Sequence, residues 1–138
     1  MSERGSITFW LLGLSLMLIA VGGIGLDLWR ALEVRRDLSG MADAAAAAAV
    51  SAIDVAHWRA TGDLRLDSAG VEQRALWALQ AQPGYAALTG SPAVGVVGGD
   101  SVVVRLERDV EMTLLRLFAG GKPFAVSAES VAYAVVRP

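Results

Sequence analysis

An uninterrupted apolar stretch near the start of the chain limits its folds more than any other feature. Residues 7–26, "ITFWLLGLSLMLIAVGGIGL", contain no charged side chain. As a helix they would cover roughly 30 Å, the thickness of the hydrocarbon core of a bilayer. Trp10 and Trp29 stand near the two ends, where indole rings favour the membrane interface. The stretch therefore predicts a transmembrane helix.

The helical pattern continues beyond this stretch. Residues 27–40 carry opposite charges at helical spacing, as in Asp27 and Arg30, which lie three positions apart. Residues 41–52, "MADAAAAAAVSA", consist mostly of alanine, the best helix former, and no proline interrupts them. We therefore expect one helix from about residue 6 to about residue 56.

The remaining residues predict a small α+β domain, so the chain divides into an anchoring and assembly helix at 1–56 and a domain at 57–138. The domain should contain one helix packed on an antiparallel sheet of about three strands. Its expected parts are a polar loop at 59–70, a helix at about 68–82 starting at Asp67 or Ser68, a hairpin at 93–112 turning at Gly98-Gly99-Asp100, an apolar loop or helical turn at 113–123, and a strand at 124–136. Trp77 and Leu79 are expected in the core.

Small and charged residues along the long helix suggest contacts with other helices. Small side chains let a neighbouring helix approach closely, and buried acids need partners. The candidates for helix packing are Gly22, Gly23, Gly25, Ala42, Ala45, Ala46 and Ala49, and those for ion pairs between subunits are Asp27, Arg30, Arg35, Arg36 and Asp43. The alternatives are a low-complexity alanine run, a solvated Asp43, and an Asp27 that only marks where the helix meets water.

A cluster of large apolar residues precedes Gly120-Gly121. Leu114, Leu117 and Phe118 either form an exposed surface for a partner or close the core of the domain. Both interpretations stay open at this point.

Composition excludes several other classes of protein. Hydrophobic residues make up 54% of the 138 residues, charged residues 19%, and the net charge is −2, which predicts no nucleic-acid partner. The chain has no cysteine, and His57 is its single histidine, so no metal site is expected. No set of nucleophile, base and orienting group is recognisable. We therefore expect no enzyme, no cofactor and no small-molecule substrate.

The charges that flank the apolar stretch leave its orientation open. The N-terminal side offers Arg4, and the other side offers Arg30, Arg35 and Arg36, interleaved with acids. A secretory signal cleaved after "ADA" at 42–44 is a further alternative, although that site lies far beyond the apolar stretch. An uncleaved signal anchor fits the spacing better.

Residues 4–52 resemble the N-terminal segment of Tad (tight adherence) pilus proteins of the TadE/TadG-like group, and most of all the short actinobacterial TadE-like proteins. The matching features are Arg4-Gly5, Asp27, Arg30, Leu38 and "MADAAAAAA" at 41–49. The resemblance implies a minor pilin or pseudopilin in the plasma membrane, possessing a pilin-like helical spine and an extracytoplasmic domain. Its implied partners are other pilin subunits, the pilus assembly platform and membrane lipid.

One departure from the family pattern keeps two alternatives open. Pilins and many TadE proteins carry a Glu at the fifth position after the prepilin cleavage site, whereas Trp10 stands five residues after Gly5 here. No Glu occurs between Arg4 and Asp27, so processing after Gly5 is in question. The alternatives are a membrane-resident scaffold of a secretion system and a secreted binding module released by cleavage near residue 44.

Overall fold

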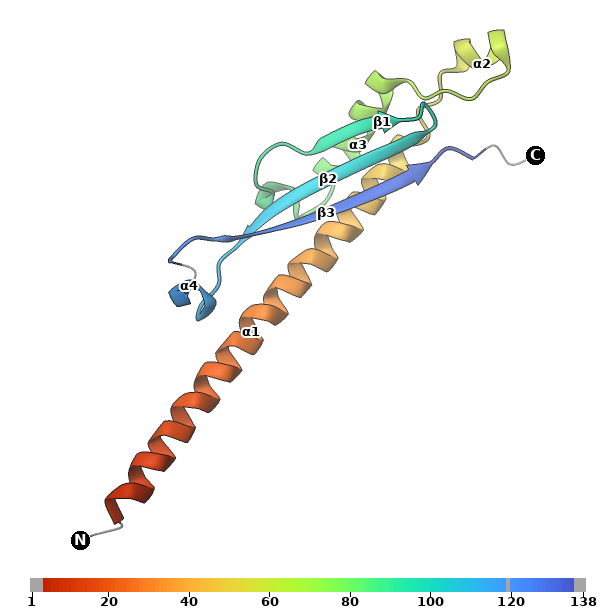
Figure 1. The fold of residues 1–138 in the computed structure, drawn as a ribbon. Helices are drawn as coiled ribbons and strands as arrows, with labels where there is room; N and C mark the ends of the chain where they lie inside the picture. Colours follow the sequence, from red (N-terminus) through yellow and green to blue (C-terminus); the bar gives the residue numbers. More distant parts are fainter. Residues whose placement is uncertain (1–3, 119, 136–138) are drawn as a thin grey trace.

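A computed structural model describes residues 4–118 and 120–135, with side chains for 7–117 and 120–135. The elements are α1 (Arg4–Ala49), α2 (Val55–Thr61), α3 (Ser68–Gln80), the 3-10 turn η1 (Tyr85–Ala87), β1 (Ala93–Val97), β2 (Ser101–Val110), α4 (Leu115–Phe118) and β3 (Phe124–Tyr133). Figure 1 shows α1 as a long rod. Its N-terminal half projects from a small domain, and its C-terminal half packs within that domain. This arrangement confirms the predicted α+β class with its long N-terminal helix.

The helix α1 ends at Ala49, so the predicted end near residue 56 was wrong. The Ser51 hydroxyl donates a 2.6 Å hydrogen bond to the Ala48 carbonyl, which satisfies an end-of-helix acceptor. Asp54 then starts a new helix, because its carboxylate accepts a 2.9 Å hydrogen bond from the His57 N–H. The short helix α2 therefore begins within the predicted end of the long helix and extends into the first residues of the loop predicted at 59–70.

The helix α3 confirms the prediction for 68–82, with Asp67 as its N-cap. The Asp67 carboxylate accepts hydrogen bonds from the N–H groups of Ala69 and Gly70. However, the prediction that Trp77 lies in the core was wrong, since its side chain is 73% exposed. The buried stripe of α3 consists of Val71, Ala75 and Leu79. Trp77 stands two positions from each of the last two, about 200° around the helix, and so faces away.

The three strands form an antiparallel meander in the order β1-β2-β3, which confirms the predicted sheet. The hairpin turns at Gly98 and Gly99, whose φ angles of 67° and 87° are ones that L side chains rarely adopt. The strand β3 ends at Tyr133, and residue 136 of the predicted strand lies outside the described residues. Alternate residues of β2, including Val102, Val104 and Leu106, point to the helices and are buried.

The core lies between the sheet and two helices, α3 and the second half of α1. Four alanines of α1 have no exposed surface: Ala42, Ala45, Ala46 and Ala49. Leu38 and Met41 extend the same buried face. The expected single helix on the sheet is thus joined by part of the long helix, whose alanines allow close approach of α3 and β2.

Candidate functional site at the exit of the apolar helix

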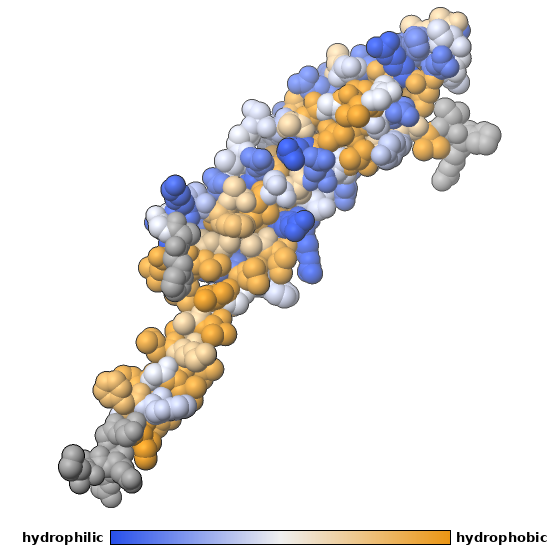
Figure 2. Space-filling view, viewed as in Figure 1, coloured by the Kyte–Doolittle hydropathy of each residue, from blue (hydrophilic) through white to orange (hydrophobic). Residues whose placement is uncertain are grey.

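The apolar half of α1 contacts almost nothing else in the chain. Residues 7–22 are exposed throughout, and large side chains such as Phe9 and Trp10 are 80% and 74% exposed. Figure 2 shows this bare stretch as a mainly hydrophobic rod below a domain whose surface mixes hydrophilic and hydrophobic residues. Among the described residues, α1 is the one helix long and apolar enough to cross a membrane. Its unburied apolar surface needs a cover of lipid or of other helices.

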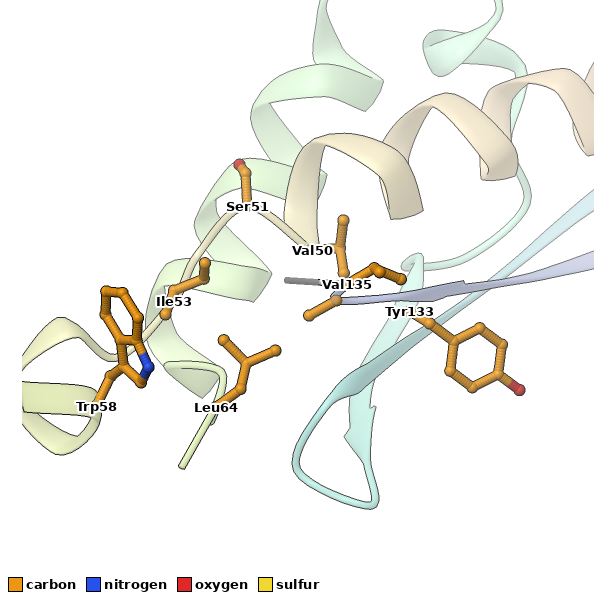
Figure 3. Close-up of a pocket in the computed structure, with 8 residues that line it drawn as sticks. Val50, Ser51, Ile53, Trp58, Leu64, Tyr133 and Val135 are labelled. Carbon is orange, nitrogen blue, oxygen red and sulfur yellow. The ribbon is translucent and has the colours of Figure 1, made fainter. Parts of the chain in front are cut away.

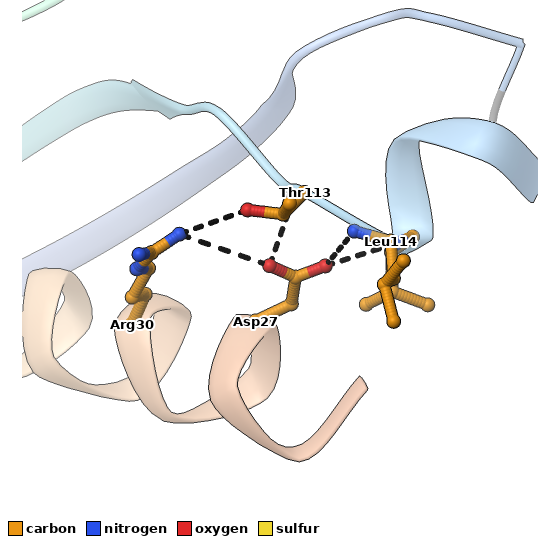
Figure 4. Close-up of polar contacts among 5 residues, drawn as sticks. Asp27, Arg30, Thr113 and Leu114 are labelled. Atoms are coloured by element: carbon orange, nitrogen blue, oxygen red, sulfur yellow. Dashed lines mark hydrogen bonds and ion pairs between the residues drawn. The ribbon is translucent and has the colours of Figure 1, made fainter. Parts of the chain in front are cut away.

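Asp27 stands at the first position after the apolar stretch and is fully buried. Its carboxylate accepts three backbone hydrogen bonds, from Thr113 at 2.8 Å, Leu114 at 2.7 Å and Leu115 at 2.9 Å (Figure 4). These donors belong to the segment that follows β2 and opens α4. Asp27 therefore fastens the loop between β2 and β3 to the long helix.

The surroundings of Asp27 favour its charged form. The N–H of Leu115 and then that of Thr113 lower the pKa of this carboxyl, while burial opposes them. Arg30 lies 4.0 Å from the carboxylate and donates a 3.0 Å hydrogen bond to the Thr113 hydroxyl. Asp27 therefore does more than mark where the helix meets water, because it binds the loop after β2 within the same chain.

Gly23 receives the side chain of Leu114 from the same loop. A Cβ atom on Gly23 would come within 2.0 Å of the Leu114 Cδ1 atom, so a larger residue would displace this leucine. Asp27 lies one turn further along α1, so the two positions form one docking site for the loop. Nothing comparable lies near Gly22 or Gly25, where an added Cβ would meet no atom within 4 Å. These two glycines leave open surface on the bare half of the helix.

The other predicted contact residues are placed as follows. Ala42, Ala45, Ala46 and Ala49 pack inside the chain's own core and offer no exposed surface to another subunit. Asp43 is exposed and accepts a 2.5 Å hydrogen bond from the Ser130 hydroxyl on β3.

Arg35 and Arg36 are also exposed, and Arg35 lines a groove beside the start of β3. The suggested pairing of Asp43 with either arginine would require a second chain.

The apolar cluster before Gly120 was predicted either to close the core or to form an exposed surface, and its members differ in this respect. Leu114 is half-buried against α1, whereas Leu117 is 76% exposed. The side chain of Phe118 lies outside the described residues. One member therefore closes the packing against Gly23, and another faces outward.

A second apolar feature lies at the opposite end of the domain. A hollow of about 450 Å³ is lined by Val50, Ser51, Ile53, Trp58, Leu64, Tyr133, Ala134 and Val135. Figure 3 shows Ile53, Leu64 and Val135 gathered around it, with Trp58 on α2 to one side. In the described part of the chain, no group of three or more His, Cys, Asp or Glu side chains could hold a metal ion.

These features fit a membrane-anchored protein, and they show one apolar helix that continues into the core of a small α+β domain. The Tad family, described as "Putative Flp pilus-assembly TadE/G-like", matches residues 5–59, which include nearly all of α1 and part of α2. This match confirms that the N-terminal segment resembles the TadE/G-like family. The match supports a structural, pilus-related role. Comparison with curated proteins and with solved structures finds no significant match.

Sequence reasoning identified Asp27 and Arg30 but missed the loop that they hold. Thr113 and the contact of Leu114 with Gly23 depend on residues more than 80 positions apart, and no local pattern joins them. The available signal was an acid directly after an apolar stretch, because such an acid needs a partner if it is buried.

Proposed function

We propose that the protein is a minor pilin or pseudopilin of a Tad-type pilus, or of its assembly machinery, with its domain outside the plasma membrane. The observation that carries this proposal is the division of α1 into a bare apolar half and a half buried in the domain. A subunit that moves from membrane to filament needs such a helix, because lipid and neighbouring helices can cover the same apolar surface in turn. The family match supports the same role.

The open glycines are the proposed contact between α1 helices of neighbouring subunits. Gly22 and Gly25 lie three residues apart, about 60° around the helix, and have free space beside them. Gly13 is also open, but it lies nine residues before Gly22, on the opposite side of the helix. Gly22 and Gly25 therefore form a small-residue surface to which Gly13 does not belong.

The exposed charges just beyond the apolar stretch complete the proposed subunit contact. Arg35, Arg36 and Asp43 remain accessible on α1, whereas Asp27 and Arg30 already have partners inside the chain. Opposite charges on neighbouring helices would set the axial stagger between subunits. The proposed partners are thus other pilin or pseudopilin subunits, the assembly platform and membrane lipid, and residues 57–138 face outward.

Shear fractionation of cells that produce the tagged protein tests this function. Surface filaments are stripped mechanically, and the protein is sought by immunoblot and intact mass. A filament subunit is expected in the sheared fraction at full or nearly full length. Protein found in the membrane pellet alone would contradict the pilin proposal.

A matched pair of variants tests the glycine surface in the same assay. Gly22→Leu with Gly25→Leu should remove the protein from the sheared fraction, because the bulky side chains keep neighbouring helices apart. Gly13→Leu, on the other side of the helix, should leave the fraction unchanged. Equal behaviour of the two variants would contradict the proposed contact surface.

A membrane-resident scaffold of the secretion system is the second candidate. The absence of Glu between Arg4 and Asp27 favours it, since the family pattern uses that Glu in the filament helix. A secreted module cut near residue 44 fits the fold less well. The helix α1 runs through this point, and the cut would remove Leu38, Met41 and Ala42 from the core.

A further inference from the structure

The loop between β2 and β3 lies at the level where the apolar stretch of α1 ends. This membrane-proximal loop, of which residues 113–118 and 120–123 are described, includes α4 and is held by Asp27 through three backbone hydrogen bonds. Leu114 reaches further and occupies the space over Gly23. Gly23 belongs to the apolar stretch and lies three residues before its end, about 4.5 Å along the helix axis. One side chain of the loop thus already sits beside the predicted membrane span.

The outward side chains of the loop suit a membrane interface. Leu117 is 76% exposed and has no apolar cover within the described structure. Arg116 and Lys122 are exposed as well, and the segment Thr113–Pro123 contains no Asp or Glu. Exposed apolar side chains flanked by lysine and arginine are typical of segments that lie in the headgroup region of a bilayer.

The surface beside the loop continues this apolar character. Leu28 on α1 and Phe124 at the start of β3 are 57% and 56% exposed, and both line an apolar hollow of about 490 Å³ next to Lys122. In Figure 1 the helix α4 lies at the end of the domain nearest to the bare half of α1. The end of the domain nearest to the apolar stretch is therefore apolar, and the loop itself adds two exposed cations.

We propose that the membrane-proximal loop is a second contact with the bilayer, in which Leu117 enters the acyl region and Arg116 and Lys122 bind the phosphates of anionic lipids. The proposal requires residues 7–26 to span the membrane and is independent of filament assembly. A single helix lets the domain rotate about the helix axis. A second contact beside that axis fixes which side of the domain lies against the bilayer and limits the tilt of the helix.

Site-directed spin labelling of the full chain in lipid nanodiscs tests this contact. The chain contains no cysteine, so single labels can be placed at Leu117→Cys, at Leu18→Cys in the apolar stretch and at Trp77→Cys on α3. Nanodiscs of phosphatidylcholine and phosphatidylglycerol supply the membrane. The label at 117 should be more accessible to oxygen than to a water-soluble nickel complex, as at 18, and the label at 77 should show the reverse.

The three labels separate failure of the loop from failure of the anchor. A lipid-like label at 18 together with a water-like label at 117 would overturn the loop proposal alone. A water-like label at 18 would overturn the membrane span, and the loop proposal and the membrane-anchored function with it. Neither result depends on whether the protein forms filaments.

The cations are tested by removing their charges while the label stays at 117. Arg116→Gln with Lys122→Gln should lower the lipid exposure of this label in nanodiscs that contain phosphatidylglycerol, with partitioning reduced about five-fold for each charge lost. In pure phosphatidylcholine the substitutions should have little effect. The control, Arg59→Gln with Arg65→Gln, removes the same charge from the far end of the domain and should change nothing. Equal effects of both pairs would overturn the role of the two cations.

Discussion

The two halves of α1 use the same secondary structure for opposite purposes. Residues 7–26 carry leucine, isoleucine and aromatic side chains and are exposed almost throughout. Residues 38–49 carry mainly alanine, and their inner face is buried completely. Both stretches are apolar, and Asp43 is the one charge that either contains.

The difference lies in what each half must fit. Lipid adapts to any side chain, so apart from Gly22, Gly23 and Gly25 the first half needs length and apolarity but no particular shape. The second half packs against α3 and the sheet, where side chains interlock at high density. Alanine lets these elements come close, and Leu38 and Met41 fill the space that remains. Side-chain size, rather than hydrophobicity, thus separates the anchor from the core.

The largest expected effect comes from shortening the same residue type in each half. Leu38→Ala should lower the free energy of unfolding by about 2–5 kcal/mol, since Leu38 is only 1% exposed and the substitution leaves a cavity. Leu18→Ala, at a residue that is 65% exposed, should change it by less than about 0.5 kcal/mol. Chemical unfolding in detergent micelles, followed by circular dichroism of the domain, measures both. Similar losses would erase the distinction between the two halves.

A smaller effect is expected from adding volume to the alanine face. Ala46→Leu should destabilise the domain by about 1–3 kcal/mol, because Ala46 is fully buried and the larger side chain would overpack the core. Ala47→Leu places the same side chain on the exposed side of the helix and should be nearly neutral. The comparison uses the same unfolding measurement. If Ala47→Leu were the more harmful variant, the alanine face would be wrongly assigned.

Asp27 stands at the junction between the two halves. The stability of the loop that it holds should depend on pH, whereas the stability of the rest of the domain should not. Its folded-state pKa is lowered, so its contribution to stability is present above the ordinary value and is lost as pH falls through the folded-state pKa. The amides of Thr113, Leu114 and Leu115 should stay protected at pH 5 and lose protection below about pH 4.

Hydrogen exchange, corrected for its intrinsic pH dependence, follows these three amides. In Asp27→Asn they should be poorly protected at every pH, whereas strand β2 keeps its protection. A uniform change across the domain would indicate that Asp27 supports the whole core instead.

The smallest effect is expected at the acid inside the alanine run. Asp43 is exposed and bonds Ser130 at the surface, so Asp43→Ala should change the free energy of unfolding by about 0.5 kcal/mol or less. The same variant tests the subunit contact, because loss of filaments without loss of stability would show a role between chains. A large destabilisation would place Asp43 with the buried face.

Many elements were predictable because their signals are local. The apolar stretch, the Asp67 cap, the glycine turn at 98–99 and the alternation along β2 each follow from neighbouring residues. The end of α1 was missed because Ser51 and Asp54 compete with the helix through hydrogen bonds that alanine propensity does not reveal. Trp77 was misplaced since its size favoured the core although its position on α3 did not.

Helix length, periodicity and motif order are properties of consecutive residues, so they were enough to predict a long apolar helix, an α+β domain and a TadE/G-like start. The packing of the alanine run inside its own chain and the hold of Asp27 on the loop at 113–115 became visible in the three-dimensional structure. Those contacts join residues far apart in the chain. Whether a small apolar face packs against its own domain or another subunit depends on which distant surface is complementary to it, and no local pattern records that.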